Sequence, residues 1–381
     1  MIRLTCVPRS ARMLETRTHE SHGARSCLAS LHCIGALILR SCRRKTPTGS
    51  PCKRKATRAI LMASIALVAA TMLITSSARA QVFVADWDSA SVNTFDATGN
   101  LQGTFVSTGS GGLAAPQGMR FGPDGNLYIT YGAYNGQPAG VKKYSGHDGS
   151  FLGTFVSGMP DASDIVFDNN GHAYVTDIGS DKVYQYNSSG QLLQTYSNGL
   201  SSPRGIAWDE AHHQVLVTND YRAPYANSVT AIDPNTGAWS TFATGLGEPE
   251  GITAGPDGKF YVANFTYSYS FGGQSPPDTI QVIGANGGVS STWSSGGTIN
   301  GAVELAAGFN RMYVTNIYSH QVEAFNFETG QYDLVFNAGH AWGIAVREAP
   351  LATPEPGNLV IGSALSVIGF VQCIRKLRKP A

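Results

Sequence analysis

A four-part pattern that recurs six times constrains the fold of this chain more than any other feature of the sequence. One short run rich in β-branched and aromatic residues recurs as VFVAD from 82, LYITY from 127, AYVTD from 173, VLVTN from 215, FYVAN from 260 and MYVTN from 312. Two further runs follow each copy, the second with an aromatic residue, and a fourth run precedes it. Turns rich in Gly, Asp and Asn connect the runs, so each unit is expected to form four short strands.

The spacing of these units predicts the architecture. Successive copies begin 42 to 52 residues apart, which is the length of a four-stranded propeller blade. A single sheet of this kind cannot bury both faces, so the blades must stack around an axis. Five complete blades start at 117, 163, 204, 250 and 300, and the sixth must combine 342–347 with 82–107. We therefore predict an all-β, six-bladed β-propeller over 81–349, closed by strands from both termini.

The repeated runs also resemble a known family. The segments VFVADWDSASVNTFDATGNLQGTF and AYVTDIGSDKVYQYNSSGQLLQTY resemble NHL-type repeats, in which a Y-V-A/T-D strand leads to a V-x-x-[FY] strand. The resemblance covers essentially all of the predicted propeller. It implies the fold but no particular function, since such propellers serve as scaffolds, as binding proteins and in some cases as enzymes.

The N-terminal segment predicts export. Cations at Lys53, Arg54, Lys55 and Arg58 precede an apolar stretch from about 60 to 74, and Ala78-Arg79-Ala80 forms a small-x-small cleavage signature. We predict a signal peptide over 53–80, with a membrane anchor as the alternative. Residues 1–52 have no apolar periodicity, and we interpret them as an over-extended or disordered N-terminus.

The C-terminal segment, 350–381, predicts a second membrane-active element. An apolar run over 359–374 is followed by a cationic end made of Arg375, Lys376, Arg378 and Lys379. Such a run suits a short transmembrane helix with its cations in the cytoplasm. Pro354-Glu355-Pro356 cannot continue this helix, so an extended segment is expected before it.

This tail resembles the PEP-CTERM sorting signal of Gram-negative bacteria, and Pro354, Glu355 and Pro356 match its motif. The resemblance implies cleavage by an exosortase after signal peptidase has acted. It also implies a transient inner-membrane anchor, then release to the cell surface or the medium, often together with extracellular polysaccharide. The alternative is an ordinary single-span anchor.

The charge and cysteine content of the central segment narrows its partners. Residues 81–350 contain 23 Asp and Glu against 9 Lys and Arg, a balance of −14, and no cysteine. A domain this acidic repels a phosphate backbone, so we expect no nucleic-acid partner. Neither a disulfide nor a thiolate metal site can form there.

One set of positions tests for a metal site. In the gluconolactonase/regucalcin family, the residue before the glycine of each inner strand supplies ligands to a divalent metal. The matching positions in this sequence are Gln117, Ser163, Arg204, Glu250, Asn300 and Trp342. Only Glu250 and Asn300 suit a Ca²⁺ or Zn²⁺ site. The alternative is that Arg204 and Glu250 form a plain ion pair.

Three long loops suggest a binding surface. The segments 131–140, 219–228 and 264–278 are expected on the face at the mouth of the central channel. Their aromatic residues include Tyr131, Tyr134, Tyr221, Tyr225, Tyr267, Tyr269 and Phe271. Aromatic rings among Asn, Gln and Ser suit stacking on sugars or docking on protein. The alternative is that these rings fold back onto their own loops.

A further ring of polar residues follows the recurring VT or VA dipeptide. It comprises Asp86, Asp177, Asn219, Asn264 and Asn316. We interpret these residues as turn caps, because Asp and Asn bond nearby backbone groups, and less readily as metal ligands.

Together these observations favour an exported, non-catalytic binding protein of the cell surface or extracellular matrix. Its expected ligand is a carbohydrate or a protein, and neither a cofactor nor a catalytic residue is predicted. The alternative is a secreted, metal-dependent hydrolase of the lactonase type, which would use Ca²⁺ or Zn²⁺ at Glu250 and Asn300.

Overall fold

A computed structural model describes residues 81–348 apart from 135, 221, 266–277 and 297. The described residues form 24 β-strands in six four-stranded antiparallel sheets, and one short 3-10 helix, η1 (Ser110–Gly112). The expected signal peptide, the sorting motif 354–356, the helix 359–374 and the cations that follow it lie outside the described residues. Among the described residues, no helix has the length and apolarity needed to span a bilayer.

The first three blades follow one another along the chain, and in each the inner strand comes first. The first blade consists of β4 (Pro116–Phe121), β5 (Leu127–Tyr131), β6 (Ala139–Tyr144) and β7 (Phe151–Met159). The second consists of β8 (Ala162–Phe167), β9 (Ala173–Asp177), β10 (Lys182–Tyr186) and β11 (Leu192–Tyr196). The third consists of β12 (Pro203–Asp209), β13 (Gln214–Asn219), β14 (Ser228–Ile232) and β15 (Trp239–Thr244).

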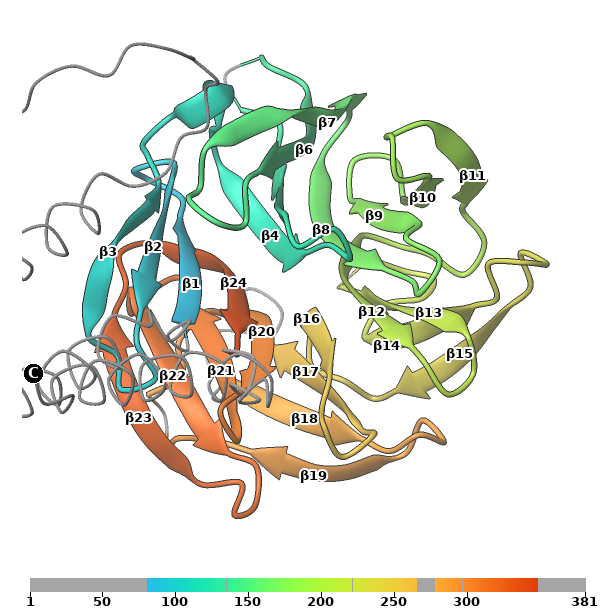
Figure 1. Cartoon of the computed structure of the whole chain (residues 1–381). Coiled ribbons are helices and arrows are strands. Elements are labelled where there is room, and N and C mark those ends of the chain that lie inside the picture. Colours follow the sequence, from blue (N-terminus) through green and yellow to red (C-terminus); the bar gives the residue numbers. More distant parts are fainter. Residues whose placement is uncertain (1–80, 135, 221, 266–277, 297, 349–381) are drawn as a thin grey trace, which may run out of the picture. The chain divides into compact units, whose positions relative to one another are not determined.

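The remaining blades complete the ring (Figure 1). The fourth consists of β16 (Pro249–Ala254), β17 (Phe260–Asn264), β18 (Thr279–Ile283) and β19 (Val289–Trp293). The fifth consists of β20 (Ala302–Gly308), β21 (Arg311–Asn316), β22 (Gln321–Asn326) and β23 (Tyr332–Asn337). The sixth combines β24 (Ala341–Arg347) with β1 (Gln81–Asp86), β2 (Ser91–Phe95) and β3 (Leu101–Val106).

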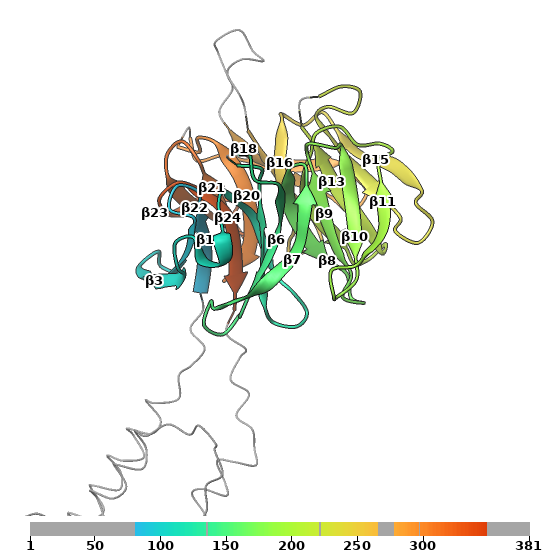
Figure 2. The ribbon, with the colours of Figure 1, turned by 90° about the horizontal axis from the view of Figure 1, so that it is seen from above.

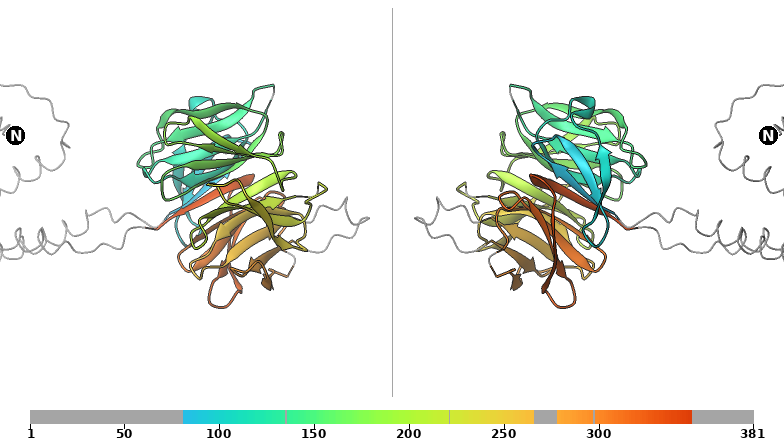
Figure 3. Two further views of the ribbon diagram at one scale, coloured as in Figure 1. Left: turned by 90° about the vertical axis from the view of Figure 1, so that its right-hand side faces the viewer. Right: turned by 90° about the vertical axis from the view of Figure 1, so that its left-hand side faces the viewer.

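The sixth blade joins the two ends of the described chain, as the repeat pattern predicts. Strand β24 pairs with β1 in antiparallel register, with Gln81 opposite Arg347 and Val84 opposite Ile344. Figure 3 shows the two strands side by side, β1 in blue and β24 in red. The predicted closure by strands from both ends is therefore confirmed.

The inner strands surround a central channel. They contact one another in the order β4, β8, β12, β16, β20 and β24, and β24 contacts β4 again. Figure 2 shows the blades from the side. Each inner strand buries one large aliphatic side chain completely, and these residues are Met119, Ile165, Ile206, Ile252, Leu305 and Ile344. Burying such a side chain contributes about 1.5–3 kcal/mol, so these six residues are a main source of cohesion between the blades.

Threonine hydroxyls connect four blades to their neighbours. Thr218 of β13 donates a hydrogen bond to the carbonyl oxygen of Glu250 in the next blade at 2.5 Å. Thr130, Thr176 and Thr315 make the same contact to Ser163, Arg204 and Trp342, each at 2.6 Å. The threonine of the recurring VT dipeptide, which is IT in the first blade, therefore satisfies a buried backbone carbonyl of the adjacent blade.

In the ring of Asp and Asn after the VT or VA dipeptide, Asp86 and Asp177 cap their own turns, as predicted. The asparagines of the ring differ, because Asn219, Asn264 and Asn316 bond the backbone of the loop before the inner strand of their blade. Asn219 accepts a hydrogen bond from the backbone of Ser201, and Asn264 accepts one from Gly247. Asp86 accepts from the backbone of Asp88 in its own turn. These side chains order the loops of the mouth face, which we define as the face formed by the loops that precede the inner strands and follow the second strands.

Candidate functional site: the channel mouth

The first feature of the mouth is a ring of residues, one from each inner strand. In the first four blades and the sixth, its members are those predicted from the sequence. They are Gln117, Ser163, Arg204, Glu250 and Trp342, and each follows the residue that pairs at the mouth end of its strand. We call these five residues and the equivalent residue of the fifth blade the mouth ring.

The fifth blade differs from the prediction. In the fourth blade, Pro249 pairs with Asn264, and the sequence predicts that residue 299 makes the equivalent pair in the fifth blade. In the structure, Ala302 makes this pair, with Asn316. Val303 therefore occupies the mouth-ring position that the sequence assigned to Asn300. The reason is that Gly301 has a φ of 81° and belongs to the turn before β20, where a glycine adopts this left-handed conformation without strain.

Asn300 itself is an exposed loop residue. Its backbone carbonyl accepts a hydrogen bond from the backbone N–H of Tyr318, and its backbone N–H donates one to the side-chain oxygen of Asn316. The proposed pairing of Asn300 with Glu250 at equivalent ring positions is thus wrong.

Charged groups meet at the mouth ring between the third and fourth blades. Arg204 Nε lies 3.3 Å from Asp220 Oδ2 and 3.5 Å from Glu250 Oε2. Burial raises the pKa of Glu250 to about 7, against the opposing effect of Arg204. The plain ion pair that the sequence offered as an alternative is therefore present, and one guanidinium serves two carboxylates.

These residues do not fit a divalent cation. A hard cation requires several oxygen ligands around one point, whereas the mouth ring offers Val303, Trp342 and the cation Arg204 at three of its six positions. Glu250 is already engaged by Arg204. In the described part of the chain, no group of three or more His, Cys, Asp or Glu residues is arranged to hold a metal.

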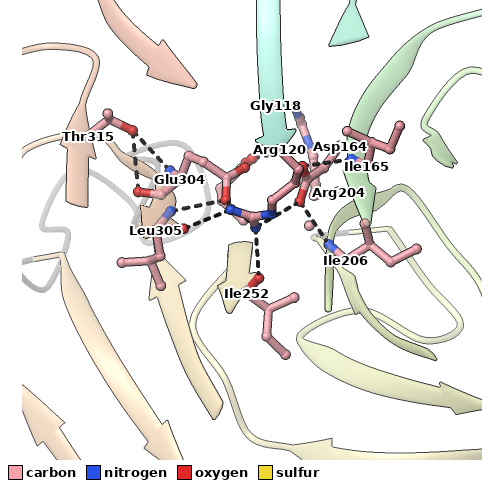
Figure 4. A network of polar contacts seen from close by, with 12 residues as sticks. Gly118, Arg120, Asp164, Ile165, Arg204, Ile206, Ile252, Glu304, Leu305 and Thr315 are labelled. Carbon is pink, nitrogen blue, oxygen red and sulfur yellow. Dashed lines mark hydrogen bonds and ion pairs between the residues drawn. The ribbon is translucent and has the colours of Figure 1, made fainter. Parts of the chain in front are cut away.

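Just below the mouth ring, the channel is occupied by a second set of charges (Figure 4). Arg120 of β4 reaches across the channel, where Nη2 lies 3.2 Å from Glu304 Oε1 and 3.6 Å from Asp164 Oδ2. Its Nη1 also donates to the carbonyl oxygen of Leu305 at 3.2 Å. We call Arg120, Asp164 and Glu304 the channel cluster.

The two carboxylates of the channel cluster stand where other blades have glycine. Gly118, Gly205, Gly251 and Gly343 occupy this position in four blades, whereas Asp164 and Glu304 occupy it in the second and fifth. Sequence reasoning missed this cluster, although Asp164 in place of the glycine of the second blade was a usable signal. In the fifth blade, Gly301 was taken for the strand glycine and concealed Glu304.

The channel cluster carries more negative than positive charge. Both carboxylates are almost fully buried and share one guanidinium. Burial raises the pKa of Glu304 to about 8, with Asp164 adding to the effect and Arg120 opposing it. Burial likewise raises the pKa of Asp164. One of the two therefore retains a proton near neutral pH, as expected for like charges in one site.

Among the described residues, the hollow above the channel cluster is small. A hollow of about 10 Å³ lies between Arg204, Glu250, Glu304 and Trp342. This volume is close to that of a single water molecule. A ligand larger than water must therefore bind on the mouth face and not within this hollow.

The predicted loop aromatics differ in exposure. Tyr131 is the last residue of β5 and only 9 % exposed, and it packs in the core beneath Lys142, whose Nζ lies 4.7 Å above its ring. The expectation of an exposed Tyr131 is wrong, because the strand continues through this residue before the loop begins. Tyr134 is 47 % exposed, as expected.

Tyr225 packs onto its own blade, in line with the alternative that the loop aromatics fold back. Its ring packs edge-on against Trp239 of its own blade, with ring centroids 5.3 Å apart. Tyr221, Tyr267, Tyr269 and Phe271 lie outside the described residues, and so do Pro354, Glu355, Pro356 and the tail cations Arg375, Lys376, Arg378 and Lys379.

The structure adds aromatic residues that the sequence analysis did not select. Trp87, after β1, lies 4.6 Å from Trp342 between ring centroids, and His340 lies 6.0 Å from Trp342. Tyr318, after β21, is 52 % exposed. We call Trp87, Tyr134, Tyr318 and Trp342 the mouth aromatics. The short loops that carry Trp87 and Tyr318 gave no length signal in the sequence.

Comparisons with known proteins show the fold. No protein-family model matches this chain, and no curated protein matches it either. A chain from a nidogen/laminin complex is similar with a TM-score of 0.54 and 14 % identity, over 71 % of this chain and 99 % of that one. The described residues form a six-bladed β-propeller.

Two further solved structures are similar. A protein of unknown function from Bacteroides caccae matches with a TM-score of 0.52 and 15 % identity, over 71 % of this chain and 100 % of that one. A virginiamycin B lyase from Staphylococcus aureus matches with a TM-score of 0.44 and 14 % identity, over 65 % of this chain and 77 % of that one. At such identities the likeness concerns the fold alone, since one propeller architecture hosts many functions.

Proposed function

We propose that this propeller is an exported, non-catalytic protein of the cell surface or extracellular matrix that binds a carbohydrate or protein ligand with its mouth face. The single observation that carries the proposal is the set of mouth aromatics around a channel that is already filled. Tyr134 and Tyr318 are about half exposed, and Trp87 and Trp342 form a close pair on the same face. Exposed aromatic groups with polar neighbours mark binding surfaces.

The filled channel favours surface binding over buried chemistry. The channel cluster occupies the axis with Arg120, and the hollow above it has room for about one water molecule. The lactonase-type hydrolase is not supported as a second candidate, because Val303 replaces the expected ligand Asn300 in the mouth ring.

The route to the cell surface forms part of the same proposal. The segment 53–80 would direct export, and 350–381 would tether the protein to the inner membrane until an exosortase cleaves near Pro354-Glu355-Pro356. Gln81 and Arg347 pair at the end of the sixth blade that is remote from the mouth. A tether attached there would leave the mouth face free to meet a ligand.

The experiment compares binding of the purified full-length protein to cells of its source bacterium. The double variant Tyr134→Ala and Tyr318→Ala removes two exposed rings of the mouth. Stacking on an aromatic side chain is worth about 1–3 kcal/mol, so we expect affinity to fall at least tenfold. The matched control is Tyr332→Ala, which removes a ring that is 37 % exposed on β23 and should leave binding unchanged.

Treatment of the cells distinguishes the two ligand classes. Periodate destroys surface sugars, and protease removes surface proteins. Loss of binding after periodate alone identifies a carbohydrate ligand, and loss after protease alone identifies a protein ligand. Equal binding by the double variant and the parent would refute the proposal that the mouth face is the binding surface.

A further inference from the structure

A second hollow lies on the outer flank of the propeller, between the second and third blades. Its volume is about 170 Å³. One wall comes from the end of β11 and the loop after it, and the other from Trp239 at the start of β15. We call this hollow the flank groove. It is independent of the channel mouth because it shares no residue with the mouth ring or the mouth aromatics.

The indole of Trp239 is fixed in place while part of it stays open. Gly199 lies against the ring so closely that a Cβ at this position would overlap the indole, and its φ of 74° also favours glycine. Tyr225 packs edge-on against the ring with centroids 5.3 Å apart. Even so, Trp239 is 39 % exposed, and its open part lines the flank groove.

The opposite wall is polar and uncharged. Gln194, Thr195, Ser197 and Asn198 line it and are exposed, and together they offer amide and hydroxyl groups as donors and acceptors. No acidic or basic side chain lines the groove. The buried residue Tyr196 forms part of its floor, where its hydroxyl already donates a hydrogen bond to the carbonyl oxygen of Pro234 at 2.9 Å.

From this arrangement we propose that the flank groove binds one ring of a neutral carbohydrate. A pyranose has an apolar C–H face that can stack on an indole, and hydroxyl groups on its edge that pair with amides and hydroxyls. An ion would find no countercharge among the lining residues. The volume is smaller than the roughly 300–1,000 Å³ of pockets for drug-sized ligands, so one sugar unit enters and the rest of the chain stays in solvent.

The equivalent positions in the other blades supply a matched control. Each outer strand begins with an exposed apolar residue at the position of Trp239, and these residues are Leu101, Phe151, Leu192, Val289 and Tyr332. Phe151 is 40 % exposed and also packs over a glycine of the segment before the inner strand of its blade, Gly111 in η1. It therefore shares the packing role of Trp239, and only the loss of Trp239 should affect sugar binding.

The experiment measures binding of neutral oligosaccharides to the purified full-length protein. The probes are tetrasaccharides of glucose, mannose, galactose and N-acetylglucosamine, titrated calorimetrically. We expect at least one of them to bind with a dissociation constant of about 1 mM or better. Trp239→Ala should weaken that binding at least tenfold, whereas Phe151→Ala should leave it unchanged.

A second variant keeps the test valid if Trp239→Ala fails to fold. Asn198→Ala removes an exposed amide that lines the groove and should weaken the same probe several-fold without changing the melting temperature. Binding that is equally strong in Trp239→Ala or Asn198→Ala and in the parent overturns the proposal, as does failure of every probe to bind. The mouth variant Tyr134→Ala and Tyr318→Ala should bind the probe normally, which separates this site from the proposed function of the mouth.

Discussion

Replacing Arg120 by methionine tests the reasoning about the channel cluster. Methionine fills similar space but removes the guanidinium that lies 3.2 Å from Glu304 and 3.6 Å from Asp164. Removing one partner of a buried ion pair costs about 3–5 kcal/mol, because the remaining charge is left unpaired. The free energy of unfolding of most domains is about 5–15 kcal/mol. The variant should therefore fold but with much lower stability at alkaline pH.

The loss should depend on pH, and its sign follows from proton binding. In the parent, burial raises the pKa of Glu304 to about 8, so the folded state retains a proton that the unfolded state has released above about pH 4.5. Stability therefore falls as pH rises, by about 1.4 kcal/mol per pH unit for each such proton. Without Arg120, the pKa of Asp164 also rises further, since its opposing charge is gone.

The expected result is a gap in stability between variant and parent that is small at about pH 5 and widens toward about pH 8. Urea unfolding, followed by tryptophan fluorescence, measures it at each pH. The control is the triple variant Arg120→Met, Asp164→Asn and Glu304→Gln, whose gap to the parent should not widen in this way because no channel carboxyl remains to titrate. A loss of equal size at both pH values, or no loss at pH 8, would refute the reasoning.

Three further predictions concern the ring and the tail. Deleting 341–347 should abolish cooperative unfolding, because β1 loses its partner; a truncated protein that unfolds in one transition at the parent's midpoint would contradict the shared blade. Thr218→Val should cost about 1–3 kcal/mol in urea unfolding, because the buried carbonyl of Glu250 loses its donor, and Thr241→Val, at an exposed position, should cost little. Replacing Pro354-Glu355-Pro356 by alanines should leave uncleaved protein in the inner-membrane fraction on immunoblots, and equal release of mutant and parent would count against exosortase cleavage.

The repeats made the fold predictable because each blade is encoded locally. Four short strands with Gly, Asp and Asn turns recur six times, so the period indicates a propeller blade and the number of copies sets the number of blades. The closure followed from one unmatched strand at 342–347 and one incomplete unit at 82–107, which β24 and β1 to β3 confirm. Turn caps such as Asp86 were also predictable, since they bond the backbone of their own turn.

The charged contacts in the channel were less predictable than the fold, because the residues that make them come from different blades and meet across the ring. Arg120 and Glu304 are far apart in sequence, and nothing local to either indicates the other. The predicted register of the fifth blade was wrong for a local reason, because Gly301 was taken for the glycine of the inner strand but belongs to the turn before it. Tyr131 was predicted to be an exposed loop residue, but β5 extends through it and its side chain is buried.

Closure by the last strand also affects the order in which the protein can fold. Strand β1 is made first among the described strands, yet its partner β24 is synthesised last. A ribosome adds about 5–20 residues per second, so β1 waits at least ten seconds or so for β24 to be made. Until then the inner edge of the sixth blade is unpaired, and such an edge can capture a strand of another chain. A nascent chain that is kept apart from other copies of the protein during this interval would pair β24 with its own β1. A nascent chain close to other copies would risk exchanging strands with one of them.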